Sequence, residues 1–327
     1  MHSVPTQTPS TDELISDLRD MLGSSVSLTA RKPWDYCSSY PIEELELSGN
    51  SAPDGTVLFK NLSPSAMLSD ARRVKIEYQC NPLREIEVYR NLLVPNEIDV
   101  PKLIGAVVKR EEDKYWLFLQ KVDGVPLWQV GDFAAWINAA KWLAKLHALS
   151  SPTRPAMTSL MKYDGDACRR WLQRADQYSR QDSDNASRRK TVSRLVKRRD
   201  AFANEFDSLP TAFVHGEYYP SNILAQTDEN HRIRVVDWEM AGIGPGLLDL
   251  ASLIAGKWTD KEREDLVASY QSECDLNSKT FNRSLTLCRL YLAIHSMGWS
   301  PNWSPPKEHA LDWYAEADRL ADELGYN

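Results

Sequence analysis

The alternation of apolar and polar residues divides the chain into two parts with different textures. In the first 120 residues, short apolar runs typical of strands occur at 42–48, 56–62, 104–110 and 115–122. A helical stretch at 81–93 lies between the second and third runs and ends before Pro95. Ser10 and Glu13 have capping-box spacing ahead of an apolar stripe, which predicts a short helix near the N-terminus. This part therefore reads as a sheet with one inserted helix.

Helical periodicity dominates beyond a boundary that we place near 120–125. Helices are predicted at 133–149, over most of 161–206, and at 261–275, 280–297 and 307–324. The apolar stretch 212–225 and the strand-like 232–238 flank a polar turn, which predicts a β-hairpin. The glycine-rich segment 242–246 is interpreted as a turn. We expect an α+β protein with an N-terminal part at 1–120, where 1–30 is an extension carrying the short helix, and a helical part at 121–327.

Composition narrows the class of protein. The chain has 327 residues, of which 42% are hydrophobic and 26% charged, as in ordinary globular proteins with more than one core. The net charge of −7 disfavours nucleic-acid binding, and no apolar run approaches the ~18 residues of a membrane span. The first residues lack the pattern of a signal peptide, and five scattered cysteines fit a reducing compartment. We expect a cytoplasmic monomer or homodimer with neither nucleic-acid nor membrane partners.

Candidate chemistry occurs at four places in a fixed order. Lys60 closes an apolar strand, and Glu85 follows in the next helix. The loop HGEYYPSN carries Glu217 and Asn222, and Asp237 ends the strand after the hairpin. Phosphoryl transfer needs a cation on the phosphates, a metal that screens them, and a group that positions the acceptor hydroxyl. A lysine held by a glutamate, two hard oxygen ligands for Mg²⁺ and a loop carboxylate meet those needs.

Three motifs carry a family resemblance. HGEYYPSN resembles the HGDxxxxN pattern of the aminoglycoside phosphotransferase and choline kinase-like family of small-molecule kinases. VVDWE at 235–239 resembles that family's (I/V)DWE segment, and GPGLLDLA at 244–251 its G-x-x-x-x-DLA pattern. The resemblance runs from about residue 30 to 300. It implies a bilobal protein kinase-like fold, with a small antiparallel-sheet lobe and a larger helical lobe.

The resemblance also implies an activity and a set of residues that perform it. The enzyme would use ATP and Mg²⁺ to phosphorylate a hydroxyl of a small molecule, such as an aminoglycoside, an amino alcohol like choline, or another secondary metabolite. Lys60 would contact the nucleotide phosphates and Glu85 would hold it. Asn222 and Asp237 would be the Mg²⁺ ligands, and Glu217 would be the catalytic base.

Two further segments would complete the nucleotide site by the same resemblance. Residues 117–122 would link the lobes, with the main chain at Leu119 and Lys121 meeting the adenine. A hairpin at 36–45 would cover the phosphates, where Ser38 and Ser39 would offer backbone N–H groups.

Glu217 departs from the family pattern, which usually has Asp at this position. One extra methylene advances the carboxylate by about 1.5 Å, and misplacement of about 1 Å can cost ~100-fold in rate. The reference pKa values of the two acids differ by only ~0.4, so the difference concerns geometry rather than basicity. The loop has retreated, the acceptor lies farther away, or the chemistry has changed. We favour retained catalysis, with a regulatory or scaffolding nucleotide-binding pseudokinase as the alternative. A kinase of protein side chains is disfavoured because the HRD, DFG and APE patterns are missing.

Three groups of residues leave the acceptor open. A polycationic acceptor would need acids, and the chain offers Asp164, Asp166, Asp312, Glu316 and Asp318, which would equally suit the surface. Trp258, Trp299, Trp303 and Trp313 either pack in the helical part or line an acceptor pocket. The basic segment 188–199 is either a solvated helix face or a contact surface for an anionic partner.

Overall fold

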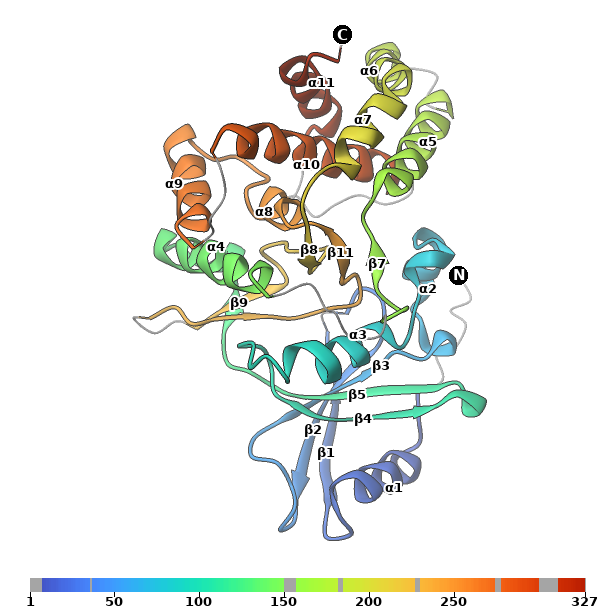
Figure 1. The fold of residues 1–327 in the computed structure, drawn as a ribbon. Helices are drawn as coiled ribbons and strands as arrows, with labels where there is room; N and C mark the ends of the chain where they lie inside the picture. Colours follow the sequence, from blue (N-terminus) through green and yellow to red (C-terminus); the bar gives the residue numbers. More distant parts are fainter. Residues whose placement is uncertain are drawn as a thin grey trace. The chain divides into compact units, whose positions relative to one another are not determined.

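The structure is a computed structural model that describes residues 8–35, 37–149, 157–181, 185–226, 230–273, 278–299 and 311–326 (Figure 1). The chain divides into two compact units. The first consists of Met1–Gly124 together with Arg234–Glu239, and the second of Val125–Ile233 together with Met240–Asn327. A short segment distant in sequence thus completes the first unit, and it contains the VVDWE acids.

An antiparallel five-stranded sheet with the order β1-β2-β3-β5-β4 forms the first unit. Its strands are β1 (Ser27–Pro33), β2 (Ile42–Ser48), β3 (Val57–Asn61), β4 (Leu103–Lys109) and β5 (Lys114–Gln120). The four predicted strands are confirmed, and β1 is additional. Phe59 on β3 lies between Trp116 and Phe118 of β5, with ring centroids 5.3 and 5.2 Å away.

Helix α1 (Thr11–Leu22) covers one face of this sheet. Ser10 caps it by accepting from the backbone N–H of Glu13 at 3.1 Å, as the capping pattern predicts. Leu14 and Leu18 of the helix share a buried cluster with Phe59. Successive side chains of a strand point to opposite faces of the sheet. Because Phe59 points into this cluster, Lys60 lies on the other face of the sheet.

Short helices connect β3 to β4, and Glu85 lies in one of them. They are η1 (Pro64–Ala66), α2 (Ser69–Val74), η2 (Glu77–Gln79), α3 (Arg84–Val88) and the π-helical turn η3 (Tyr89–Leu93). The helix predicted at 81–93 exists, but it starts at Arg84 and its last turn widens to a π-helix. Pro95 follows this turn, where an N–H is no longer required. A short turn, η4 (Arg110–Glu112), joins β4 to β5.

The second unit is mainly helical, and α10 packs against four other helices, α5, α7, α8 and α11. Its helices are η5 (Leu127–Gln129), α4 (Phe133–His147), α5 (Gly165–Gln181), α6 (Ala186–Lys197), α7 (Arg199–Asp207), α8 (Leu247–Leu253), α9 (Asp260–Gln271), α10 (Ser278–Trp299) and α11 (Trp313–Leu324). None of the helices in the described part of the chain is both long and apolar enough to cross a membrane.

Two small sheets position the loops of this unit. Strand β11 (Gly242–Pro245) lies between β7 (Met161–Lys162) and β8 (Thr211–Val214), while β6 (Val125–Pro126) pairs with β9 (Ile223–Ala225). Strand β10 (Ile233–Val235) follows the predicted hairpin turn, in which the N–H of Gln226 donates to the carbonyl of Arg232 at 3.0 Å.

The interpretation of 242–246 as a turn is wrong, because most of it is β11. Glycine is needed there because β7 approaches closely: a Cβ at Gly242 would lie 2.5 Å from the carbonyl oxygen of Met161 on β7.

The basic segment 188–199 falls mostly in α6, where Arg194 pairs with Asp318 at 3.0 Å and Arg188 lies over the ring of Tyr314. This segment therefore fits a helix face packed on α11.

Candidate active site

Lys60 is the centre of a buried charge cluster in the first unit. It is only 7% exposed, and its Nζ lies 2.7 Å from Oε2 of Glu85 and 2.5 Å from Oδ1 of Asp237. Burial disfavours the ammonium, but the charges of Asp237 and Glu85 outweigh it and raise the pKa of Lys60 well above its usual value. Lys60 therefore carries a fixed positive charge on the face of the sheet opposite α1.

The two acids beside Lys60 have different environments. Glu85 is 2% exposed, and burial raises its pKa to about 6, with Lys60 opposing the shift and Asp237 adding to it. The backbone N–H of Trp238 donates to Oε1 of Glu85 at 3.3 Å. Asp237 is 24% exposed and has φ of +66°, a left-handed backbone that is uncommon outside glycine. Such strain concentrates at functional sites, which marks Asp237 as a constrained position.

Glu239 is a further acid of the first unit that the sequence analysis did not single out. Its Oε1 accepts from the hydroxyl of Ser39 at 2.7 Å and lies 2.6 Å from Nζ of Lys75. Its carbonyl oxygen accepts from the guanidinium of Arg84, the residue before Glu85. Glu239 thereby holds the segment of Ser39 and the start of α3 in place. The VVDWE motif contained this residue, so its place two positions after Asp237 was the available signal.

The segment predicted to cover the phosphates lies at a hairpin connection. Residues 34–41 join β1 to β2, and the N–H of Trp34 donates to the carbonyl of Ile42 at 2.9 Å. Ser38 and Ser39 both belong to this connection, although Tyr36 lies outside the described residues. The Ser39 hydroxyl is committed to Glu239, so phosphate contacts there would use the backbone.

The predicted adenine contacts, Leu119 and Lys121, lie at the end of β5. Leu119 pairs with Leu58 on one side and Leu103 on the other. The N–H of Lys121 donates to the carbonyl of Thr56 at 2.8 Å, and its side chain forms an ion pair with Glu44. The N–H of Lys121 is therefore already used in a hydrogen bond beside the sheet, and a contact with adenine at this residue would use its carbonyl oxygen.

In the second unit, the loop after β8 holds Glu217 and Asn222 in a compact turn. The carbonyl of Glu217 accepts from the N–H of Tyr219 at 2.7 Å and from Nδ2 of Asn222 at 3.0 Å. The N–H of Glu217 donates to Nδ1 of the fully buried His215 at 3.2 Å. Because the Asn222 amide nitrogen donates to the loop, a metal predicted at this residue would use its amide oxygen.

Asp249 on α8 anchors this loop from beneath. Its two carboxylate oxygens accept from the N–H groups of His215 and Gly216 at 2.7 and 2.9 Å. His147 of α4 lies 3.2 Å from the same carboxylate, and its other ring nitrogen is 2.9 Å from the hydroxyl of Tyr270 on α9. A chain of buried, hydrogen-bonded side chains from α4, α8 and α9 thus fixes the backbone just before Glu217. This arrangement suits an orienting role for His215 rather than a reacting one.

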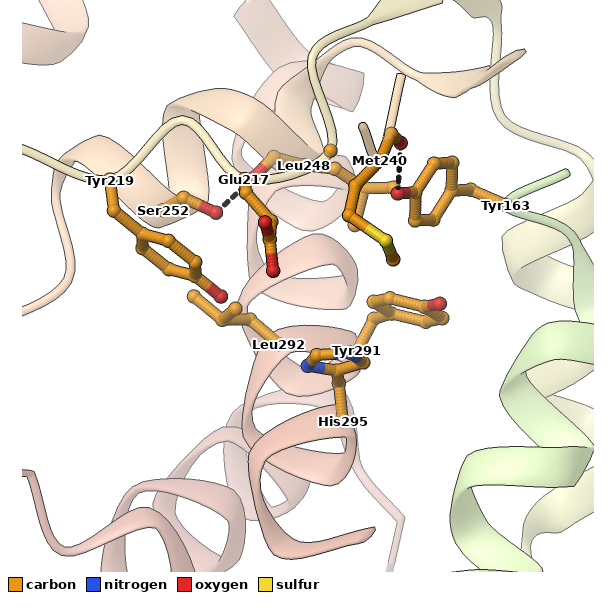
Figure 2. Close-up of a pocket in the computed structure, with 10 residues that line it drawn as sticks. Tyr163, Glu217, Tyr219, Met240, Leu248, Ser252, Tyr291, Leu292 and His295 are labelled. Carbon is orange, nitrogen blue, oxygen red and sulfur yellow. Dashed lines mark hydrogen bonds between the residues drawn. The ribbon is translucent and has the colours of Figure 1, made fainter. Parts of the chain in front are cut away.

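A cavity of about 350 Å³, solvent mouth included, opens beside Glu217 (Figure 2). The Glu217 side chain points from the loop into it, toward Leu292 and His295 of α10. The remaining lining residues are Tyr163, Gly216, Tyr219, Met240, Leu248, Ser252 and Tyr291. We call this the tyrosine cavity. All of its lining residues belong to the second unit.

The tyrosine cavity is poor in charge. Glu217 is the only acid among its lining residues, which all lie in the described part of the chain. Burial and the charges of Glu217 and Asp249 raise the pKa of Tyr219, so its phenol stays neutral. Burial and the charge of Arg174 lower the pKa of His295 to about 4, so its imidazole is neutral at pH 7. One carboxylate therefore faces neutral aromatic walls.

The acids considered for a polycationic acceptor do not line this cavity. Asp164 and Asp312 cap helices through Ala167 and Ala315, and Asp166 pairs with Arg169. The remaining two pair with arginines, Asp318 with Arg194 and Glu316 with Arg289.

The tryptophans considered for the acceptor pocket do not line the tyrosine cavity either. Trp258 packs on Trp136, Trp299 stacks on Trp171, and Trp313 lines a different cavity. Trp303 lies outside the described residues. The aromatic walls are instead Tyr163, Tyr219 and Tyr291, which no spacing in the sequence connects.

Two groups of predicted residues are thus brought together. Lys60, Glu85 and Asp237 form one cluster in the first unit, while Glu217 and Asn222 share one loop in the second.

The profile of a family described as "Phosphotransferase enzyme family" matches residues 67–274. The match covers Glu85, the HGEYYPSN loop and Asp237, and it begins after Lys60. No curated protein matches the sequence.

Solved kinase structures are similar to this chain over nearly its whole length. A choline kinase from Cryptosporidium parvum Iowa II is 16% identical, with 97% of this chain and 95% of that chain covered and a TM-score of 0.59. A microcompartment-associated aminopropanol kinase is 15% identical, with 96% and 99% covered and a TM-score of 0.62. An aminoglycoside phosphotransferase from Streptomyces rimosus, in complex with ADP and streptomycin, is 15% identical, with 90% and 100% covered and a TM-score of 0.56. At these identities the likeness concerns the fold, and it confirms the predicted kinase-like α+β class.

Proposed function

Because the chain belongs to the phosphotransferase enzyme family, we propose that it transfers the γ-phosphoryl group of ATP, with Mg²⁺, to a hydroxyl of a small molecule. Family membership confirms the predicted resemblance and the predicted class of enzyme. The observation that most supports the proposal is the buried ammonium of Lys60 between two carboxylates. A fixed cation in this position suits the phosphates of a nucleotide, and the Streptomyces rimosus phosphotransferase of similar fold was solved with ADP.

The metal would be held by oxygen atoms that suit Mg²⁺. The amide oxygen of Asn222 is presented by a fixed side chain, and Asp237 contributes a partly exposed carboxylate. Hard oxygen donors of this kind are what Mg²⁺ prefers. When bound, the ion would offset the negative charge of the phosphates. The Lys60 ammonium lies on the same carboxylate of Asp237, so it would orient this ligand as well.

Glu217 would position the acceptor hydroxyl and take its proton. Its carboxylate points into the tyrosine cavity from a loop whose backbone is tied to Asp249. In the proposed step the acceptor oxygen bonds to the γ-phosphorus, the bond to ADP breaks, and the hydroxyl proton passes to the Glu217 carboxylate. The longer arm of glutamate reaches farther into the cavity than aspartate would from the same backbone.

The cavity favours an acceptor with at most one positive charge. A polycation would need several carboxylates, whereas this cavity offers one, and that one is needed for the proton transfer. Tyr163, Tyr219 and Tyr291 give large apolar surfaces with hydroxyl groups at their edges. Small neutral alcohols and amino alcohols therefore fit better than aminoglycosides.

A screen for ADP release tests this function. The chain would be incubated with Mg-ATP and a panel of neutral alcohols, amino alcohols and aminoglycosides. With the best acceptor, Glu217→Gln is expected to lower the rate by 100-fold or more, since general bases contribute about 10²–10⁴. Glu217→Asp keeps the carboxylate but withdraws it, so its rate should lie between the two. The exposed Glu264 provides the matched control, and Glu264→Gln should leave the rate unchanged.

Three outcomes separate the alternatives. Equal rates for Glu217→Gln and the unmodified protein would show that Glu217 is not the base. ATP binding without turnover on any acceptor would favour the pseudokinase. Faster turnover of aminoglycosides than of the uncharged or singly charged acceptors would overturn the argument from cavity charge.

A further inference from the structure

A second cavity in the second unit has the opposite electrostatic character. It also encloses about 350 Å³, solvent mouth included, and we call it the arginine cavity. Its lining residues are Ala251, Ile254, Ala255, Gly256, Arg263, Arg289, Leu292, Leu311, Trp313 and Glu316. Two guanidinium groups thus face one carboxylate in a chain whose net charge is −7. Apart from Leu292, which also lines the tyrosine cavity, the proposed phosphoryl transfer uses none of these residues.

The single carboxylate of this cavity is shared. Oε1 of Glu316 accepts from Arg289 at 2.6 Å and from Arg319 at 3.0 Å, and Oε2 accepts from Arg319 at 3.1 Å. Burial alone would raise the pKa of Glu316, but the hydrogen bonds and charges of Arg319 and Arg289 lower it. Glu316 is therefore ionised, and Arg319 takes up much of its capacity to accept hydrogen bonds.

The two arginines that line the cavity have unused donors. Within the described part of the chain, Arg289 makes one hydrogen bond, to Glu316, although a guanidinium has five N–H donors. Nε of Arg263 is buried and has no hydrogen-bond partner among the described residues. Its one ion pair with a described residue is a 3.7 Å contact of Nη1 with Asp260, whose side chain is 99% exposed.

Within the lining of the cavity, two guanidinium groups share the single carboxylate of Glu316. Burial lowers the pKa of Arg289, and the nearby charges of Arg319 and Arg263 act in the same direction, against Glu316. A half-buried guanidinium with free donors and positive neighbours is stabilised by an added anion, which satisfies both the charge and the N–H groups.

We propose that the arginine cavity is a binding site for an organic anion, with a carboxylate or phosphate head on Arg263 and Arg289 and a small apolar body. The planar fork of arginine matches the oxygens of either head group. Ala251, Ile254 and Leu311 supply apolar wall, and Trp313 adds an aromatic face. Leu292 lines this cavity and the tyrosine cavity alike, so the two cavities adjoin at this side chain.

Calorimetric titration of the full chain with hexanoate, acetate and inorganic phosphate tests this site without nucleotide or turnover. A failed search for kinase activity therefore leaves the result unaffected. Hexanoate is expected to bind at one site, at least tenfold more tightly than acetate because of the apolar wall. If phosphate binds more tightly than hexanoate, the natural head group is a phosphate.

Variants assign the binding to this cavity. Arg263→Gln is expected to weaken the preferred probe tenfold or more, and Arg263→Lys should weaken it less because the charge remains. Arg180 is an exposed arginine paired with Asp176, so Arg180→Gln serves as the matched control and should bind as the unmodified chain does. Phosphate bound near Lys60 contributes equally to all of these proteins. The proposal is overturned if no probe binds, or if Arg263→Gln binds as tightly as the Arg180→Gln control.

Discussion

Removing the charge of Lys60 should make the stability of the first unit depend on pH above 6. In Lys60→Met, Glu85 loses its cation while staying 2% exposed. The pKa of Glu85 is already raised to about 6 beside Lys60, and buried glutamates without a partner reach about 8–9. Between pH 6 and 8 the folded variant then binds a proton on Glu85 that the unfolded chain, with a pKa of 4.5, does not.

The sign and size of the effect follow from this difference in proton binding. Because the folded state holds the extra proton, the free energy of unfolding falls as the pH rises. Two pH units at about 1.36 kcal/mol each amount to a loss of about 2.7 kcal/mol in the variant between pH 6 and 8. In the unmodified protein, the fall in the free energy of unfolding that Glu85 causes is largely complete near pH 6. The stability of the unmodified protein should therefore be nearly independent of pH between pH 6 and 8.

Amide hydrogen exchange of β3 and β5 at pH 6, 7 and 8 would measure this free energy for the first unit alone. The double variant Lys60→Met/Glu85→Gln removes the carboxylate and should be nearly flat. The exposed Lys261–Asp265 pair gives the matched control, and Lys261→Met should change stability by less than about 0.5 kcal/mol. If Lys60→Met loses the same stability at pH 6 and pH 8, lost packing rather than an unpaired carboxylate explains its cost.

Two further predictions concern the second unit. Gly216→Ala should destabilise it by about 3 kcal/mol or more in urea unfolding, because φ is +85° and the new Cβ would lie 2.1 Å from Tyr163 Oη and 2.4 Å from the Met240 carbonyl. Gly131→Ala, which has open space, should be nearly neutral, and equal losses would contradict the steric argument. Since burial and Arg174 lower the pKa of His295 from 6.5 to about 4, the folded state binds fewer protons, and stability should fall as the pH drops from 6.5 to 4. The loss should be about 2–3 kcal/mol, reduced for partial exposure, and urea titrations should show it absent in His295→Asn; an unchanged slope in that variant would assign it to other groups.

The strands of the first sheet were predictable where one face is buried. β2 and β3 carry apolar residues such as Leu45 and Phe59 on the α1 side, so the sequence shows their pattern. β1 lies at the edge of the sheet and is largely exposed, with Arg31 and Lys32 among its residues. Edge strands commonly carry such charges, which removes the pattern that would reveal them.

Glycine could not be interpreted from sequence alone. Gly242 and its neighbours read as a turn, yet they form a strand because β7 approaches too closely for any side chain. A glycine chosen for closeness and a glycine chosen for backbone freedom are identical in sequence, and only the neighbouring strand distinguishes them.

Residues of the candidate site could be predicted from the sequence only where they share a motif or follow the order expected for the family. HGEYYPSN and VVDWE lie in short segments, so their local spacing pointed to them. The walls of the tyrosine cavity come from distant places, such as Tyr163 before α5 and Tyr291 within α10. Tertiary packing brings these residues together, and no local spacing encodes that contact.

The membership of Arg234–Glu239 in the first unit has a consequence for how the protein is synthesised. When the ribosome has produced residue 124, the nascent sheet still lacks Asp237 and Glu239. At that stage Lys60 can form its ion pair with Glu85 alone, and Glu239, the ion-pair partner of Lys75, has not yet been synthesised. Domains generally mature in the order of translation, but this one must wait until more than one hundred further residues have emerged. Its final assembly is therefore a late event in translation, overlapping with that of the helical unit.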